Sequence, residues 1–214
     1  MSFTVLTVCA ANVCRSPLMA LCLERSFLAR GFGGDVDVRS AGVSAAEGDG
    51  ACPEIARLTK SRGLPWLTLE QHRSRALTDE QIDRADLILT ADRALRSEIV
   101  KRARPGSIGR TFTLREAAEL AEAVSFRVEE RTMEGNLRTL TTQLHHSRGF
   151  IDLPRVQRLP TRTLPWRRLQ VHTHDVPDAH EGARAPHGIV LRLTMPTADR
   201  LAATLAHGVL AHLR

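Results

Sequence analysis

Short apolar runs alternate with amphipathic segments along the first 120 residues. The run Phe3-Thr-Val-Leu-Thr-Val-Cys9 is apolar and β-branched, and a polar turn follows it, which predicts a buried parallel strand. Apolar residues then recur at helical spacing from Leu18 to Leu28. We expect a helix that Ser16 caps, with Pro17 at its first position and Gly31 at its end.

The same alternation of strand and helix continues downstream. Further strands are predicted over Val36 to Gly42, Asp86 to Thr90 and Arg110 to Leu114, and further helices over 53–62, 93–102, 115–123 and about 197–213. Alternating β and α elements favour a parallel sheet covered by helices on both faces. We therefore predict an α/β fold of three layers, α/β/α, with a central four-stranded parallel sheet.

The pattern loosens over about 126–173. A polar helix through Leu144 gives way to a stretch that holds Pro154, Pro160 and Pro165 among many arginines. The length of 214 residues suits an ordinary domain that carries an insertion of a few dozen residues. We predict one domain over residues 1–214, with an irregular basic insertion at 126–173.

Composition and charge narrow the function classes. Hydrophobic residues make up 43% and charged residues 25% of the chain, as in globular proteins, and the net charge is +6. The positive charge is scattered, and neither a recognition helix nor an aromatic stacking face is evident, so no nucleic-acid partner is expected. No run of 18 apolar residues and no leader pattern occurs, which favours a cytoplasmic protein without a membrane partner.

Cysteine and histidine spacing argues against a metal site. The four cysteines, at 9, 14, 22 and 52, have no paired CxxC spacing, which indicates neither a zinc site nor a disulfide framework. Histidines gather at 145–146, 172, 174 and 180 in an irregular basic stretch, without a ligand motif such as HExxH. We expect no metal and no cofactor.

A cysteine and an arginine bracket the turn between the first strand and the first helix. Backbone N–H groups of a loop that leads into a helix converge on one centre, and the helix dipole adds positive charge, so a tetrahedral oxyanion fits there. The predicted phosphate-binding residues are Ala10, Ala11, Asn12, Val13, Cys14, Arg15 and Ser16.

This setting assigns three chemical roles. Cys9, as a thiolate, would attack phosphorus and form a phosphocysteine. Arg15 would bind two equatorial oxygens in a bidentate manner, and Ser16 would donate a hydrogen bond to the sulfur. A bare cysteine–x5–arginine match also arises by chance, with the cysteine as a packed strand residue and the arginine as a surface charge. The strand–loop–helix context favours the chemical interpretation.

The stretch Val-Leu-Thr-Val-Cys-Ala-Ala-Asn-Val-Cys-Arg-Ser-Pro resembles the signature of the low-molecular-weight protein tyrosine phosphatases, V-C-x-G-N-x-C-R-S-P. Later segments also resemble landmarks of that family: Ser40-Ala41-Gly42, Gln71 to Arg75, Ala85 to Leu89 and Phe112 to Glu116. The resemblance implies that Ser40 holds Asn12 and so supports the loop. It also implies that Cys14 can form a reversible disulfide with Cys9.

The same resemblance implies a general acid, an aspartate in an Asp-Pro loop before the last helix. Asp178 and Asp152 are the candidates, and Asp178 is favoured because the C-terminal helix follows it closely. Two departures from the family pattern stand out. Ala179 replaces the expected proline, and Ala11 replaces a glycine whose backbone is expected to need a positive φ or a close approach to phosphate.

We therefore expect a phosphatase that hydrolyses phosphomonoesters, with protein phosphotyrosine as the leading substrate and a phosphorylated protein as its partner. A thiol-dependent arsenate reductase is one alternative, although no cysteine follows Cys52 to serve as a relay. A weakened phosphate-binding regulatory protein is another, and the presence of both Cys9 and Arg15 argues against it. No oligomeric state is predicted.

Overall fold

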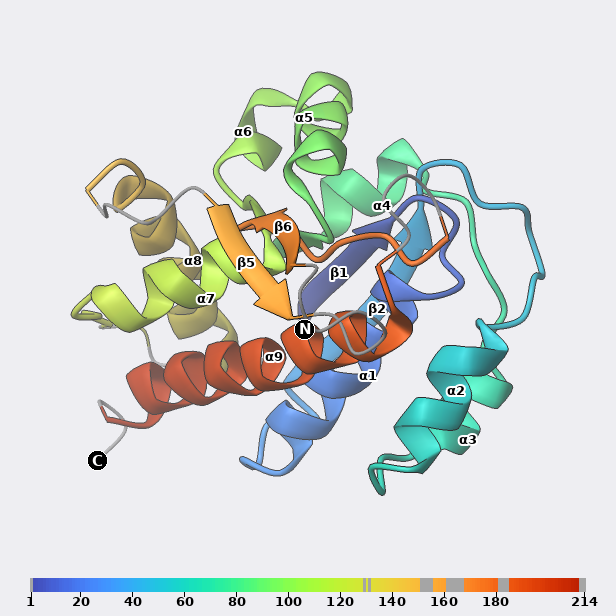
Figure 1. Ribbon diagram of the computed structural model, residues 1–214. Coiled ribbons are helices and arrows are strands. Elements are labelled where there is room, and N and C mark those ends of the chain that lie inside the picture. Colours follow the sequence, from blue (N-terminus) through green and yellow to red (C-terminus); the bar gives the residue numbers. More distant parts are fainter. Residues whose placement is uncertain are drawn as a thin grey trace.

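The computed structural model describes residues 2–128, 130, 132–150, 156–160, 168–180 and 185–211. Its central sheet is parallel, with the strand order β2-β1-β3-β4 (Figure 1). The strands are β1 (Phe3–Cys9), β2 (Val36–Gly42), β3 (Leu87–Thr90) and β4 (Thr111–Thr113). The predicted four-stranded parallel sheet is confirmed.

Helices cover both faces of this sheet. One face packs against α1 (Arg15–Leu28), α7 (Leu114–Ala123), α8 (Met133–His146) and α9 (His187–Leu210), and the other against α4 (Asp79–Arg84) and α5 (Arg93–Arg102). Side chains of β1 alternate between the two cores: Val5 lies in the first, Leu6 and Val8 in the second. The three-layer α/β/α prediction is thus confirmed.

Three short helices and a hairpin complete the described part of the chain. The helices are α2 (Pro53–Lys60), α3 (Trp66–Glu70) and α6 (Pro105–Ile108). The strands β5 (Val156–Pro160) and β6 (Arg168–His172) pair antiparallel within the segment that the sequence predicted to be irregular. None of the helices within the described ranges combines the length and apolar character that a membrane span requires.

Two helix starts differ from the prediction. The last helix begins at His187 rather than near residue 197, because Pro196 lies inside α9 and does not open it. The first helix begins at Arg15, and the residue at its N-cap position, Cys14, provides no side-chain cap. Ser16 does not cap α1, since its hydroxyl lies among the groups around Cys9.

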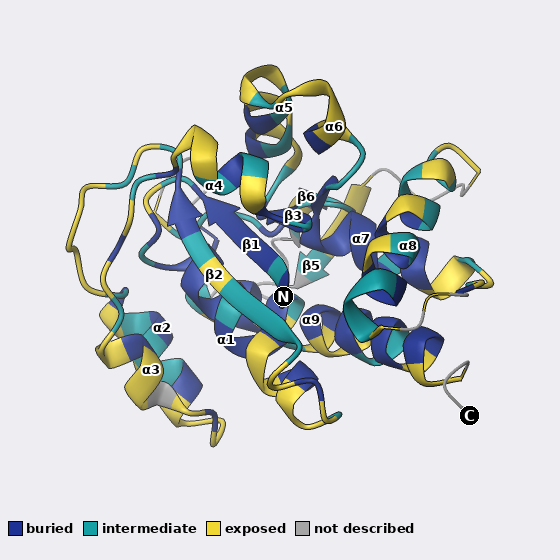
Figure 2. Ribbon diagram, turned by 180° about the vertical axis from the view of Figure 1, so that it is seen from behind, coloured by how far each residue is buried: buried dark blue, intermediate teal, exposed yellow. Residues whose placement is uncertain are grey.

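Parallel strands bring their carboxyl ends to one edge of the sheet, where α/β proteins bind ligands. The central strands β1 and β3 are deeply buried (Figure 2). The edge therefore collects the loops that follow Cys9, Gly42 and Thr90 on a rigid base. The predicted phosphate loop lies there, between β1 and α1.

Candidate active site

Cys9 is the last residue of β1, and its thiol is surrounded by hydrogen-bond donors. The backbone N–H of Asn12 donates to its Sγ over 3.3 Å. The Ser16 hydroxyl accepts from Asn12 Nδ2 (2.9 Å), so its one proton is left for Cys9 Sγ at 3.0 Å or for the Ala41 carbonyl at 3.2 Å. These groups surround the sulfur on the side of the loop.

Asn12 fixes the shape of the loop. It is fully buried and is the single non-glycine residue with a positive φ (54°) in the described ranges. Asparagine tolerates this conformation better than most residues. Its Oδ1 accepts a hydrogen bond from the Arg75 backbone N–H (2.9 Å). The side chain is therefore held at both ends, by Ser16 and by Arg75.

The prediction that Ser40 holds the Asn12 side chain is wrong in this structure. Ser40 lies on β2 opposite Thr7. Ser40 and Asn12 are both described residues, and no hydrogen bond joins them; the Asn12 side chain contacts Ser16 and Arg75 instead. The segment after α3 supports Asn12 instead, through the Arg75 N–H. This segment lies against the end of β2, where the Gly42 N–H donates to the Arg75 carbonyl.

His72 adds a further contact to the same turn. Its Nε2 lies 2.7 Å from the Asn12 carbonyl, which can only accept, so Nε2 carries the proton. Burial lowers the pKa of His72 below its ordinary value, although the bond to Asn12 opposes this shift. The neutral ring therefore acts as a fixed donor that holds the loop.

Gly42 allows the loop to lie directly against β2. A Cβ at this position would lie 2.4 Å from the Ala10 carbonyl oxygen and 2.7 Å from the Asn12 nitrogen. Ala11 is exposed and does not share the positive φ of Asn12. Ala11 therefore does not need the positive φ or the close approach that was expected of it. Asn12 has the left-handed conformation, and Gly42 is the residue against which the loop backbone packs closely.

We expect Gly42→Ala to displace the phosphate loop. Overpacking costs about 1–3 kcal/mol, and a shift of the reacting groups by about 1 Å lowers turnover by about 10²-fold. Thermal unfolding and para-nitrophenyl phosphate hydrolysis measure both effects. The matched control is Gly34→Ala, where a Cβ meets no atom within 4 Å. Wild-type turnover by Gly42→Ala would show that the loop does not need this close approach.

Arg15 lies in the first turn of α1 and is 4% exposed. Its Nη1 donates to Asp92 Oδ2 (2.8 Å) and to the Val176 carbonyl (3.4 Å), and its Nη2 donates to Asp178 Oδ2. The sequence analysis did not identify Asp92. Its signal is its place directly after β3, at the carboxyl edge of the sheet. The two carboxylates hold the guanidinium beside the loop.

The segment around Asp178 is fixed by backbone contacts. Val176 N–H donates to the Ala91 carbonyl (2.8 Å), and the Asp178 carbonyl accepts from Ala185 N–H (3.0 Å). Ala179, which replaces the expected proline, packs against the main core. These contacts give the segment a defined position without a proline ring. The other acid candidate, Asp152, lies outside the described residues.

An open cleft of about 580 Å³ lies beside these groups. Its lining includes Ala10, Arg15, Asp92, Asp178 and His172. The cleft therefore opens onto the predicted phosphate loop at Ala10 and Arg15.

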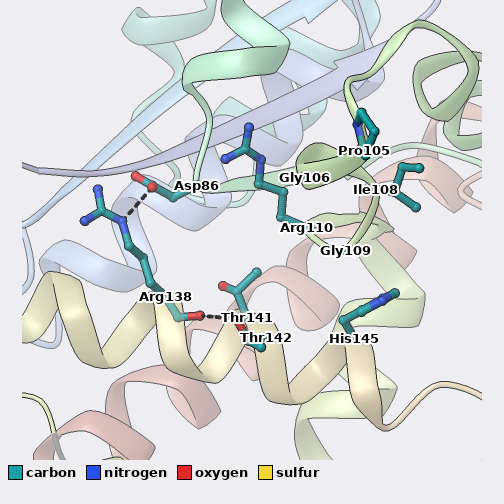
Figure 3. A pocket seen from close by; sticks show the side chains of 10 residues that line it. All are labelled: Asp86, Pro105, Gly106, Ile108, Gly109, Arg110, Arg138, Thr141, Thr142 and His145. Atoms are coloured by element: carbon teal, nitrogen blue, oxygen red, sulfur yellow. Dashed lines mark hydrogen bonds and ion pairs between the residues drawn. The ribbon is translucent and has the colours of Figure 1, made fainter.

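A second cavity of about 540 Å³, lined by Asp86, Arg110, Arg138 and His145 among others, lies at the opposite edge of the sheet (Figure 3). Asp86 precedes β3 and accepts a hydrogen bond from Thr4 N–H near the start of β1. This cavity is thus separate from the candidate active site.

Cys14 has a second cysteine beside it, and the disulfide with Cys9 that the resemblance implies stays a prediction. All four cysteines are free thiols, and the Sγ atoms of Cys14 and of Cys52, the residue before α2, lie within 4.8 Å of each other. The contact with Cys14 is the main cause that lowers the pKa of Cys52, to about 4, and the contact with Cys52 raises the pKa of Cys14 above its ordinary range together with burial. The structure thus gives Cys14 a thiol neighbour that the sequence did not indicate.

Comparison of the sequence with known proteins finds its relatives among phosphatases. The family model for low molecular weight phosphotyrosine protein phosphatase matches residues 4–140. A probable low molecular weight protein-tyrosine-phosphatase, EpsP of Ralstonia nicotianae, is 34% identical over 131 residues, which cover 61% of this chain and 83% of the relative. A protein-arginine-phosphatase of Geobacillus stearothermophilus is 37% identical over 116 residues, covering 54% and 72%.

Solved structures share the fold across the chain. The YwlE arginine phosphatase from Geobacillus stearothermophilus superposes with a TM-score of 0.62 at 25% identity, covering 98% of this chain and 97% of that one. A protein tyrosine phosphatase from Entamoeba histolytica superposes with a TM-score of 0.64 at 18% identity, covering 97% and 99%. The chain therefore belongs to the low molecular weight phosphotyrosine protein phosphatase family, whose members are cysteine-dependent phosphatases.

Proposed function

We propose that this protein hydrolyses phosphomonoesters of protein side chains through a phosphocysteine formed at Cys9. The observation that carries the proposal is that the Asn12 N–H and the Ser16 hydroxyl lie within hydrogen-bond distance of Cys9 Sγ, beside the buried Arg15. A thiolate at the end of β1 would attack phosphorus in line. The loop amides from residue 10 to 16 and the start of α1 would bind the three equatorial oxygens.

Arg15 would change partners when the phosphoryl group binds. Its guanidinium now donates to Asp92 and Asp178. A dianionic phosphoryl group in the loop would accept two of its N–H groups, and a planar guanidinium suits such bidentate contact. Asp92 would continue to orient the arginine, and the Asp178 carboxyl group would be released toward the leaving oxygen.

Asp178 is the proposed general acid. Its Oδ1 accepts a hydrogen bond from the His180 backbone N–H (2.8 Å), and its side chain is 20% exposed, beside the cleft. A protonated Asp178 would give its proton to the departing oxygen, and the carboxylate would then take a proton from the water that cleaves the phosphocysteine.

We expect Asp178→Asn to lower kcat by about 10²- to 10⁴-fold with a phosphotyrosine peptide, because the leaving phenolate would depart unprotonated. The loss should be smaller with para-nitrophenyl phosphate, whose leaving group is more acidic. Steady-state kinetics on both substrates measure this difference.

The matched control is Asp175→Asn. Asp175 lies three residues earlier, and its carboxylate binds Arg93. This variant should keep most of the activity, because the Asp175 carboxylate pairs with Arg93 and not with Arg15. Equal losses for the two variants on both substrates would contradict the role of Asp178 and indicate a general effect on the loop.

The proposed substrate is phosphotyrosine on a protein partner, as in the tyrosine phosphatases of the family. Relatives named as arginine phosphatases make phosphoarginine the competing substrate. Hydrolysis of a phosphotyrosine peptide and of the same peptide with phosphoarginine decides between them, by the ratio of the two kcat/KM values. The free thiols favour a reducing compartment, and we propose the cytoplasm.

A further inference from the structure

Four potential metal ligands meet beside the phosphate loop. They are Cys14, Cys52, His180 and His187, and one donor atom from each lies within 4.8 Å of the others. Cys52 Sγ lies 3.2 Å from His187 Nε2, which lies 3.3 Å from His180 Nε2. The cluster joins separate parts of the chain, so no spacing motif indicates it.

These distances suit a tetrahedral ion. Zinc bonds of about 2.3 Å to sulfur and about 2.0 Å to imidazole nitrogen set neighbouring donors roughly 3.3–3.8 Å apart. Small movements of the rings would bring the four donors to this spacing. Two thiolates and two imidazoles in a tetrahedron select zinc over magnesium or calcium, which prefer oxygen.

The surroundings also suit a bound ion. Both cysteines are almost fully buried, His187 is half-buried and His180 is exposed, so an ion could enter from the histidine side. The Cys52 backbone N–H donates to the Val13 carbonyl (2.7 Å), which ties this ligand to the phosphate loop. The two histidine rings contact each other edge to face, with centroids 4.9 Å apart.

We propose that Cys14, Cys52, His180 and His187 bind one zinc ion that fastens the segment of Asp178 to the phosphate loop. Binding would release the thiol protons of the two cysteines, and no electron transfer takes place. The ion would connect Cys14, inside the phosphate loop, to His180, two residues after Asp178. This site goes beyond the phosphatase chemistry, and it departs from the absence of a metal that cysteine and histidine spacing predicted.

The test is zinc binding by the full-length protein, kept reduced and stripped of metal. Zinc is titrated against a chromophoric chelator, and cobalt serves as a spectroscopic probe of tetrahedral thiolate ligation. We expect one zinc per chain. Loss of even an outer-shell partner lowers metal affinity by about 10- to 100-fold, so Cys52→Ser and His187→Ala should lose at least that much.

Three control variants show whether the zinc ion lies at this cluster. Cys22→Ser and His207→Ala remove a cysteine and a histidine outside the cluster and should bind zinc like the wild type. Cys9→Ser should also keep its zinc, which distinguishes the cluster from binding at the nucleophile. Zinc should raise the melting temperature of the wild type and of these controls, but not that of His187→Ala, whose fold is checked by circular dichroism.

The proposal fails if the wild type binds no zinc. It also fails if Cys52→Ser and His187→Ala retain wild-type affinity, or if Cys9→Ser alone loses the ion. None of these outcomes depends on turnover, so the zinc site and the phosphatase mechanism are tested separately.

Discussion

Replacing Cys9 with serine is expected to abolish hydrolysis of para-nitrophenyl phosphate. Loss of a covalent nucleophile lowers turnover by on the order of 10⁴- to 10⁶-fold, because the chemical step has no efficient alternative. Ser16 and the Asn12 amide favour the negative charge of a thiolate at this position. A serine hydroxyl ionises far less readily than a thiol, so the same donors would not create a comparable nucleophile. Initial rates measured at high enzyme concentration give the residual activity.

Cys22→Ser is the matched control for this substitution. Cys22 is a buried thiol on α1 that packs in the main core, away from the phosphate loop. The variant should retain most of the activity with a modest loss of stability. Turnover by Cys9→Ser within about tenfold of the wild type would rule out the phosphocysteine mechanism.

Arg15→Lys is expected to lower kcat by about 10²- to 10³-fold, the loss found when a donor to transition-state charge is removed. A lysine ammonium cannot make the two parallel contacts of a guanidinium, and its shorter reach leaves Asp92 and Asp178 incompletely paired. We expect a weaker affinity for the competitive inhibitor phosphate as well, measured by its effect on para-nitrophenyl phosphate hydrolysis.

The control for charge alone is Arg93→Lys. Arg93 borders the same cleft, but its guanidinium is half-exposed and pairs with Asp175. This change should alter kcat little, because exposed ion pairs contribute about 0–1 kcal/mol. If Arg15→Lys behaves like Arg93→Lys, then bidentate binding by Arg15 is not needed for catalysis.

The regular part of the fold was predictable because its signals are local. Short β-branched runs and helical periodicity identified the central strands and the main helices, since each pattern reflects burial on one face or both. The last helix began earlier than predicted because Pro196 lies inside α9 instead of preceding it. The β5–β6 hairpin was missed because prolines and arginines obscure any strand alternation there.

The candidate site was predictable only in part. Cys9, Arg15 and Ser16 lie in one continuous motif, so the sequence alone could propose them together. Asp92 and His72 were missed because folding brings them to the loop from distant segments.

Ser40 illustrates the opposite error. It was assigned by resemblance, and in this structure the Arg75 amide makes the contact with Asn12 that was expected of it. The positive φ that was expected at Ala11 likewise occurs at its neighbour Asn12.

The central claim, covalent catalysis by Cys9, is tested most directly by trapping the intermediate. The protein is mixed with excess para-nitrophenyl phosphate, quenched within the first turnover, digested and analysed by mass spectrometry. We expect one phosphoryl group on the sulfur of Cys9, and more of it in Asp178→Asn if that residue also activates the water. Rapid turnover with no phosphorylated Cys9, or with the phosphoryl group on another residue, would contradict covalent catalysis by this cysteine.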